Sequence, residues 1–206
     1  IIAEQIDLAD TDAAKDFLNR SIATMGGLDV LILNAGVTGL KEPNDYVHKV
    51  NEVANIALSE SAIEALRKNG GTIVFMTSET AHTDLGGGIE AYRVSKMNME
   101  KWLSDFSKNP ENANVKIFSV NPGSVDTRMH QEVVAYGTGD IKARTEQKIA
   151  GHKLRDPNTV GSIISKMAIS GNKYNSGTNN YDIPIKSGEV VVVTDENVEF
   201  EGAKHN

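Results

Sequence analysis

A serine, a tyrosine and a lysine near the middle of the chain have the types and spacing that proton transfer requires. Tyr92 and Lys96 stand four residues apart, so a helix through them places both side chains on one face. Ser78 precedes them at the end of an apolar run. A phenol has a pKa of about 10 and is a poor base at neutral pH, but an adjacent ammonium group favours the phenolate. The three residues are therefore a candidate centre for general acid and base catalysis.

The elements that position these residues alternate between short apolar runs and longer amphipathic segments. Expected strands are residues 1–6, 28–33, 72–77, 115–120 and 189–193, and expected helices are residues 11–24, 44–68, 89–108 and 157–170. This alternation predicts βαβ units around a parallel sheet, with helices on both of its faces. The helix 89–108 has one buried face, because Met99, Trp102, Leu103 and Phe106 recur at helical spacing.

Further candidate residues directly follow the expected strands. Ligands of a doubly wound sheet bind at the carboxyl ends of its strands, so these positions come first. Besides Ser78 they are Asp7, Leu8, Asn34, Ala35, Gly36, Asn121, Pro122 and Gly123.

Composition narrows the class of protein. The 206 residues suit one domain, and 39% hydrophobic with 24% charged residues is typical of a soluble globular protein. The net charge of −7, without a basic stripe, argues against nucleic acid as a partner. No apolar run approaches the ~20 residues of a membrane-spanning helix, and the absence of cysteine excludes disulfides, so we expect a cytoplasmic protein. The five histidines lack metal-binding spacing, which predicts no metal and only surface or capping roles.

Taken in order, these residues resemble the short-chain dehydrogenase/reductase family from Asp7 to about Val193. The matching positions are Asp7, Asn34-Ala35-Gly36, Val50-Asn51, Ser78, Tyr92 with Lys96, and Pro122-Gly123 followed by Val125 and Thr127. The resemblance implies a three-layer α/β/α fold around a mainly parallel, Rossmann-like sheet. It also implies hydride transfer between NAD or NADP and an alcohol or ketone carbon, in a homodimer or homotetramer formed through the helices 44–68 and 89–108.

The resemblance further implies a role for each matching residue. Tyr92 would be the general acid and base, and Ser78 would hydrogen-bond the substrate oxygen. Lys96 would lower the pKa of Tyr92 and bind the nicotinamide ribose, while Asn51 would anchor a water of a proton relay. The coenzyme contacts would come from Asp7 and Leu8 at the adenine, the turn Asn34-Ala35-Gly36, Pro122-Gly123 with Val125 at the nicotinamide ring, and Thr127 at its carboxamide.

Several positions keep a second interpretation. Asp7 either contacts the adenine or begins a helix together with Asp10. Asn51 is either part of the relay or a solvated helix residue, and the two glycine-containing turns are either coenzyme contacts or ordinary turns. The polar segment 124–155 is either a substrate lid or a solvated surface helix.

The family's glycine-rich phosphate turn is absent from this chain. We therefore expect roughly 40 to 50 residues with the first two strands ahead of Ile1, since a βαβ unit takes ~30 residues. Residues 1–193 would form a single domain, followed by a mobile tail, 194–206. A coenzyme-binding sensor or truncated non-catalytic relative is the alternative function. A lyase of the halohydrin dehalogenase type is disfavoured, because Lys96 stands where that family has arginine.

Overall fold

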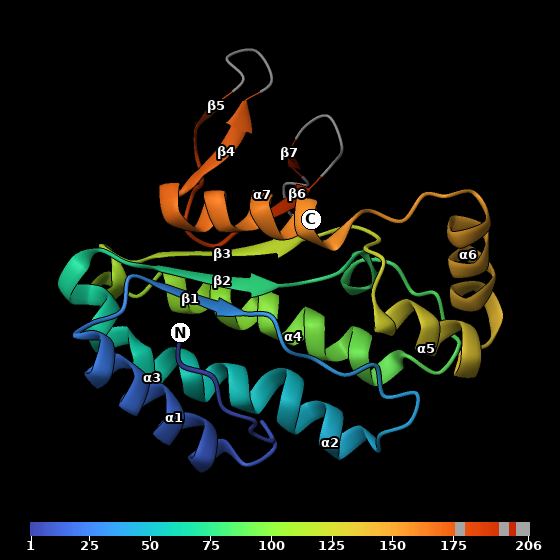
Figure 1. Cartoon of the computed structure of the whole chain (residues 1–206), viewed down its shortest axis with the longest axis horizontal. Coiled ribbons are helices and arrows are strands. Elements are labelled where there is room, and N and C mark those ends of the chain that lie inside the picture. Colours follow the sequence, from blue (N-terminus) through green and yellow to red (C-terminus); the bar gives the residue numbers. More distant parts are fainter. Residues whose placement is uncertain (176–179, 194–197, 201–206) are drawn as a thin grey trace.

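The computed structural model describes residues 1–175, 180–193 and 198–200. Its central sheet has the order β1-β2-β3-β6-β7 (Figure 1). The strands β1 (Val30–Leu33), β2 (Thr72–Met76), β3 (Lys116–Asn121) and β6 (Glu189–Val193) run parallel, and β7 (Val198–Phe200) pairs antiparallel with β6. The predicted α/β architecture with a mainly parallel sheet is confirmed.

Helices cover both faces of this sheet (Figure 1). On one face lie α1 (Thr11–Met25), α3 (Ala54–Asn69) and α4 (Glu90–Ser107), and on the other lies α7 (Pro157–Ser170). Each face has its own apolar cluster, one including Leu66, Phe75 and Leu103, the other including Phe118 and Met167. Strand β2 is buried along its whole length, as the apolar run of its sequence requires.

The expected strand at residues 1–6 is wrong. No strand of the described chain lies beside this segment, so its backbone has no ladder to join. It lies against α1 instead, where Arg20 donates hydrogen bonds to the Glu4 carboxylate at 3.0 and 3.1 Å. Strand β1 is consequently an edge strand of the described sheet, and Ile32 is 40% exposed.

Two strand pairings were not predicted from the sequence. A separate hairpin, β4 (Asn172–Asn175) with β5 (Asn180–Pro184), stands beside α7 (Figure 1). The tail expected to be mobile contains β7, which extends the central sheet, while residues 194–197 and 201–206 of that tail lie outside the described residues.

The helix expected at residues 44–68 contains an irregular turn. It consists of α2 (Asn44–His48), a π-helical turn (Lys49–Val53) and α3. A π turn inserts one extra residue into the helix and is frequent at functional sites. Here it contains Asn51, one of the residues that the resemblance singled out.

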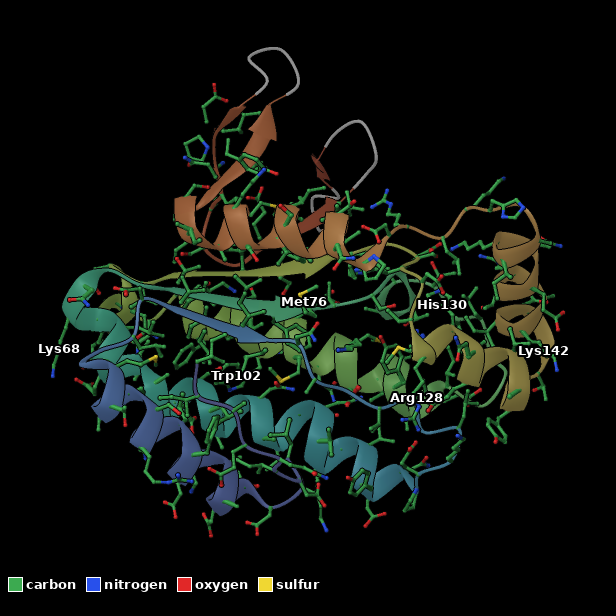
Figure 2. The ribbon with its side chains drawn as sticks, viewed as in Figure 1. Lys68, Met76, Trp102, Arg128, His130 and Lys142 are labelled. Atoms are coloured by element: carbon green, nitrogen blue, oxygen red, sulfur yellow. The ribbon has the colours of Figure 1, made fainter. Side chains whose placement is uncertain are left out.

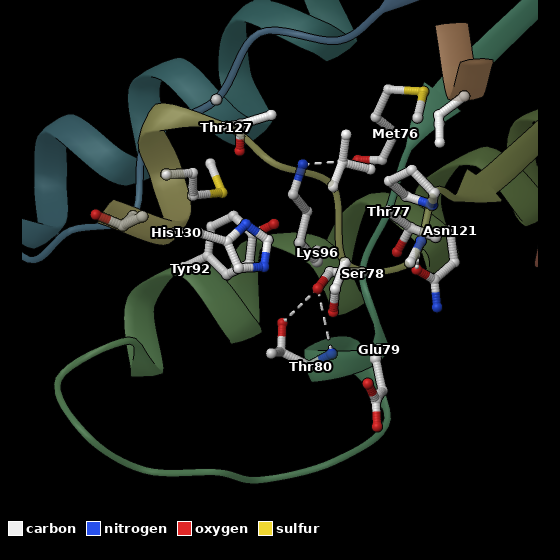
Figure 3. A pocket seen from close by; sticks show the side chains of 18 of the residues that line it. Met76, Thr77, Ser78, Glu79, Thr80, Tyr92, Lys96, Asn121, Thr127 and His130 are labelled. Carbon is white, nitrogen blue, oxygen red and sulfur yellow. Dashed lines mark hydrogen bonds between the residues drawn. The ribbon is translucent and has the colours of Figure 1, made fainter. Parts of the chain in front are cut away.

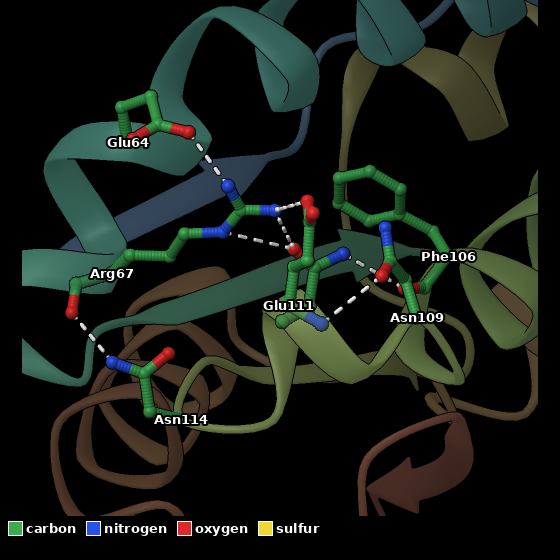
Figure 4. Close-up of polar contacts among 7 residues, drawn as sticks. Glu64, Arg67, Phe106, Asn109, Glu111 and Asn114 are labelled. Atoms are coloured by element: carbon green, nitrogen blue, oxygen red, sulfur yellow. Dashed lines mark hydrogen bonds and ion pairs between the residues drawn. The ribbon is translucent and has the colours of Figure 1, made fainter.

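The amino ends of β2 and β3 are closed by a polar cluster around Arg67, at the end of α3 (Figure 4). Its guanidinium donates to Asn112 Oδ1 at 2.7 and 3.2 Å, to Glu64 at 2.6 Å and to Glu111 at 3.3 Å. Asn112 is buried and donates onward to the Phe106 carbonyl. The 3-10 turn Pro110–Asn112 is thereby tied to α3 and leads directly into β3.

Between β3 and α7 the chain forms two further helices, α5 (Arg128–Tyr136) and α6 (Gly139–Ala150). They extend beyond the carboxyl ends of the strands, at the right of Figure 1. Among the described helices none is long and apolar enough to cross a membrane.

The outer face of α4 bears on the predicted homo-oligomer. Trp102 and Phe106 stack at 4.5 Å and pack against the core of the same chain, whereas Met97 is 41% exposed. The homo-oligomer stays a prediction.

Candidate active site

A cavity of about 770 Å³ opens at the carboxyl ends of β1, β2 and β3. Its wall contains the candidate residues named from the sequence except Asp7, Leu8, Val50 and Asn51: Asn34, Ala35, Gly36, Ser78, Tyr92, Lys96, Asn121, Pro122, Gly123, Val125 and Thr127. The residues after β1, β2 and β3 meet at one edge because parallel strands end on the same side of the sheet.

Ser78 is oriented by the short 3-10 turn Glu79–Ala81 that follows it. Its extended backbone makes it the N-cap of that turn, and its Oγ accepts hydrogen bonds from Thr80 N at 3.3 Å and Thr80 Oγ1 at 3.0 Å (Figure 3). A serine hydroxyl has two acceptor sites and one proton to donate. The contacts with Thr80 fix the position of the Ser78 hydroxyl, which also hydrogen-bonds Tyr92.

Tyr92 is buried at the first turn of α4. Burial raises the pKa of its phenol above the usual value, and the hydrogen bond with Ser78 acts in the opposite direction. The prediction that Lys96 lowers the pKa of Tyr92 does not hold in this arrangement. The Lys96 ammonium lies 5.3 Å from the Tyr92 ring centre and donates instead to the Met76 carbonyl at 2.7 Å.

Burial lowers the pKa of Lys96 to about 8, and the neighbouring Glu100 carboxylate opposes this change. Glu100 lies one turn further along α4, accepts a short hydrogen bond from Thr77 and pairs with His82 at 3.1 Å. Burial in turn raises the pKa of Glu100. The floor of the cavity therefore contains a buried ammonium whose anionic neighbour is linked to a partly exposed imidazole.

Asn51 lies behind the cavity wall, in the π turn. Its carboxamide accepts from Val37 N at 2.9 Å and donates to Val37 O at 3.0 Å and to Ser95 Oγ at 3.1 Å. It is completely buried, so the alternative of a solvated helix residue is wrong. A Cβ on Gly36 would lie 3.2 Å from Asn51 Oδ1 and 3.7 Å from Lys96 Nζ. The side chains of Asn51 and Lys96 therefore both lie close to the backbone of Gly36. The water-anchoring role stays a prediction.

Asp7 and Leu8 lie outside the cavity wall. Asp7 accepts hydrogen bonds from Ala9 N and from the Tyr46 hydroxyl, both at 2.9 Å. The N-cap of α1 is Asp10 alone, since its carboxylate accepts from Ala13 N. Asp7 therefore does not begin the helix, and its contact with an adenine stays a prediction.

The segment 124–155 forms one side of the cavity. Met129, His130, Val133, Ile141, Arg144, Thr145 and Lys148 of α5 and α6 contribute to the wall. Two contacts fasten α6 to the rest of the site: Lys148 donates to Ser124 Oγ at 2.7 Å, and Thr138 N donates to Gly87 O at 3.3 Å. The segment is more than a solvated surface helix, while its opening and closing as a lid stays a prediction.

Sequence reasoning missed several residues of this wall, and one of them corrects an expectation. His130 was assigned a surface or capping role, yet its side chain faces the cavity and its Nδ1 is buried without a hydrogen-bond partner among the described residues (Figure 3). Burial and the nearby Lys148 lower its pKa. Thr80 and Arg144 lie in segments expected to line a substrate pocket, residues 79–89 and 124–155, but were not singled out individually. Glu100, which lies beside Lys96 and outside the wall, was missed. No spacing rule distinguishes these three positions.

The comparisons with known proteins agree with this geometry. A family model described as short chain dehydrogenase matches residues 1–136. Oxidoreductase UcpA of Salmonella typhimurium is 24% identical over 190 residues, covering 86% of this chain and 72% of that protein. The short chain dehydrogenase/reductase AacuN of Aspergillus aculeatus is 27% identical over 139 residues, covering 64% and 52%. The chain thus spans between half and three quarters of these two relatives.

Solved structures show the same fold. The short chain dehydrogenase/reductase YIR035C from Saccharomyces cerevisiae has a TM-score of 0.75 at 20% identity, covering 92% of this chain and 75% of that one. A short chain dehydrogenase from Burkholderia cenocepacia, solved in complex with NADP, has a TM-score of 0.67 at 25% identity, covering 81% and 69%. The 3-oxoacyl-[acyl-carrier protein] reductase from Brucella melitensis, in complex with NAD, has a TM-score of 0.67 at 20% identity, covering 80% and 69%.

Proposed function

Because the chain belongs to the short-chain dehydrogenase family, we propose that it is an oxidoreductase transferring a hydride between a nicotinamide coenzyme and the carbon of an alcohol or ketone. The observation that carries the proposal is the presence of Ser78, Tyr92 and Lys96 in the wall of one cavity. Figure 3 shows the three side chains around the same space, with Thr80 beside Ser78.

Tyr92 is the proton donor and acceptor of this proposal. The raised pKa keeps its phenol protonated at neutral pH, which suits a general acid that protonates the carbonyl oxygen during reduction. In the oxidative direction Tyr92 would have to start as the phenolate, the form that reduction leaves behind, in order to take the proton from the alcohol. Ser78, held in place by Thr80, would turn its one proton from Tyr92 to the substrate oxygen when the substrate is bound.

The coenzyme would lie along the loops that follow β1 and β3, where Gly36 and Gly123 line the cavity. Gly123 has a φ of 71°, which favours a residue without a side chain. Lys96 and Thr127 are the polar groups that would hold the ribose and the carboxamide. When bound, the coenzyme supplies or accepts the hydride. The relatives solved with NADP and with NAD support either coenzyme.

A coenzyme-binding sensor without turnover is the second candidate. What opposes it is the presence of Ser78 and Tyr92 together with Lys96, because binding of the coenzyme alone needs neither the serine nor the tyrosine.

An absorbance assay distinguishes the two. The purified chain is mixed with NADH or NADPH and a panel of ketones and aldehydes, and the decay of nicotinamide absorbance is followed with alcohol formation as the second readout. Coenzyme oxidation that depends on the carbonyl compound is the expected result. Coenzyme binding, measured by fluorescence, without any turnover would favour the sensor. If the chain shows neither coenzyme binding nor turnover, both functions are refuted for it.

A further inference from the structure

Resting on the proposed function, we propose that the substrate is a carbonyl or hydroxyl compound that also carries a carboxylate, and that Arg144 binds this carboxylate. The cavity contains charges that reduction of a simple ketone does not use. Two of them, Arg144 and Lys148, lie on α6.

The proposal depends mainly on the position of Arg144 and on its lack of a partner. Its side chain is part of the cavity wall, and its guanidinium forms no hydrogen bond or ion pair with any residue in the described part of the chain. Lys148 lies four residues later, so the two cations share one face of α6 and both line the cavity. Arg144 is exposed, and unlike Arg67 and Lys101 it has no ionic partner among the described residues.

The charge balance of this wall matches a monoanion. Lys148 pairs with Glu79 at 3.7 Å and donates to Ser124, so its charge is largely compensated. The lowered pKa of His130 leaves its imidazole uncharged at neutral pH. On the α6 side of the cavity, Glu79 compensates one of the two positive charges, which leaves the charge of Arg144 without a counter-charge. A carboxylate would neutralise that charge, and the phosphate-bearing probe described below tests whether a dianion, which could also draw on Lys96, is bound instead.

The chemistry of the wall also favours a carboxylate with a hydrocarbon body. A guanidinium forms two parallel hydrogen bonds with a carboxylate, a geometry that fixes the direction of the bound molecule. The neighbouring wall is apolar and consists of Leu85, Ile89, Met129, Val133 and Ile141. A molecule held by its carboxylate at Arg144 with an apolar body along this wall would present its carbonyl to Ser78 and Tyr92. The substrate class is therefore an oxo acid, with the matching hydroxy acid as product.

Activity towards matched pairs of compounds tests the proposal. The probes are 2-oxohexanoate and 5-oxohexanoate, each compared with its methyl ester, and dihydroxyacetone phosphate as the phosphate-bearing alternative. We expect the wild-type kcat/KM for at least one acid to exceed that of its ester by about tenfold or more. Arg144→Gln should lower the value for that acid about 10- to 100-fold and leave the ester within about twofold.

Lys142→Gln is the matched control, because Lys142 lies on the same helix but outside the cavity wall and loses the same charge (Figure 2). It should leave both activities unchanged. Arg144→Lys, which retains the charge and loses the paired hydrogen bonds, should give an intermediate value. Calorimetric binding of the acid to wild type and Arg144→Gln provides a readout that needs no turnover, and melting curves verify that each variant folds.

The outcomes separate this inference from the function on which it rests. Equal use of acids and esters by the wild type, preference for the phosphate, or an equal loss in Lys142→Gln would each overturn the carboxylate site while leaving an oxidoreductase that uses neutral ketones. If no carbonyl compound is reduced, the proposed function fails. The carboxylate site then stands only if calorimetry shows acid binding that Arg144→Gln abolishes.

Discussion

At the amino ends of β2 and β3 the polar residues are saturated with partners, while at the carboxyl ends of the same strands they are not. Arg67 makes hydrogen bonds or ion pairs with Asn112, Glu64 and Glu111, and these contacts close the sheet at that end. At the other end, Arg144 has no partner in the described chain, and His130 has a buried nitrogen without one. Lys96 is a buried ammonium with a lowered pKa.

The difference indicates that the polar residues at the amino end stabilise the fold, whereas those at the carboxyl end are available for chemistry. Buried polar groups are nearly always hydrogen-bonded, so the unpaired His130 nitrogen in the cavity marks a place where a ligand can supply the missing partner, while Arg144 is exposed and available to a ligand. Buried groups with shifted pKa values are similarly concentrated at functional sites. If this contrast is right, changes at the carboxyl end alter activity or titration more than stability, and changes at the amino end do the reverse.

The largest expected effect belongs to Tyr92→Phe at the carboxyl end. Removal of the phenol proton should lower kcat by ~10² to 10⁴, which corresponds to ~3 to 5 kcal/mol of transition-state stabilisation. Coenzyme affinity should stay nearly unchanged, because Lys96 is assigned the ribose contact. Steady-state kinetics and a coenzyme titration measure both quantities. A variant that retains more than about a tenth of wild-type turnover would place the proton donor elsewhere.

Lys96→Met should change how stability depends on pH. In the folded protein Lys96 releases its proton at about pH 8, whereas the unfolded chain keeps it up to about pH 10.5. Between these values the unfolded state binds more protons, so the free energy of unfolding of the wild type rises with pH, by at most about 3 kcal/mol in total. Lys96→Met lacks this rise, and at neutral pH it also lacks the cost of a buried charge.

Urea unfolding of both proteins at intervals from pH 7 to pH 9.5 measures this difference, below the range in which tyrosines titrate. Burial also lowers the pKa of Lys173, but that residue is present in both proteins, so the difference between the two curves isolates Lys96. Parallel curves would show that Lys96 titrates in the folded protein as it does in water.

The smallest of the three effects is expected for Arg67→Met at the amino end. The change leaves Asn112 Oδ1 buried without its donor, which should lower the free energy of unfolding by about 1 to 3 kcal/mol. The kcat value should be unaffected, since the cavity lies at the other end of the sheet. Lys68→Met is the matched control, because Lys68 is exposed and loses the same charge. A loss of activity in Arg67→Met at full stability would contradict the division between the two ends.

Much of the fold followed from local sequence patterns. The helix predicted at residues 157–170 has those bounds, and the strands predicted at 28–33, 72–77 and 115–120 are found within two residues of their ends. Strong periodicity and terminal residues such as Asp156 and Gly171 determine these elements locally. The strand predicted at residues 1–6 is wrong because a strand is not determined by local sequence alone. Its apolar residues suit a strand, but a strand also requires a neighbour, which local sequence does not show.

Some residues of the candidate site could likewise be predicted from local sequence, and others could not. Ser78, Tyr92 and Lys96 were identified because their residue types and spacing carry the chemistry, and adjacent parallel strands bring the loops that follow them together. Thr80 was missed, because its importance comes from two hydrogen bonds to Ser78 and from nothing in its own position along the chain.

By itself, the sequence determined most of the helices and parallel strands, the family and the residues with reactive side chains, since each depends on residue type and on spacing over a few positions. The tertiary structure decided the electrostatics. Burial raises the pKa of Tyr92 and directs the Lys96 ammonium to the Met76 carbonyl, and the packing of α6 over the strand ends brings Arg144 and Lys148 into the wall. Desolvation and charge pairing depend on which atoms surround a group, and those atoms come from distant parts of the chain.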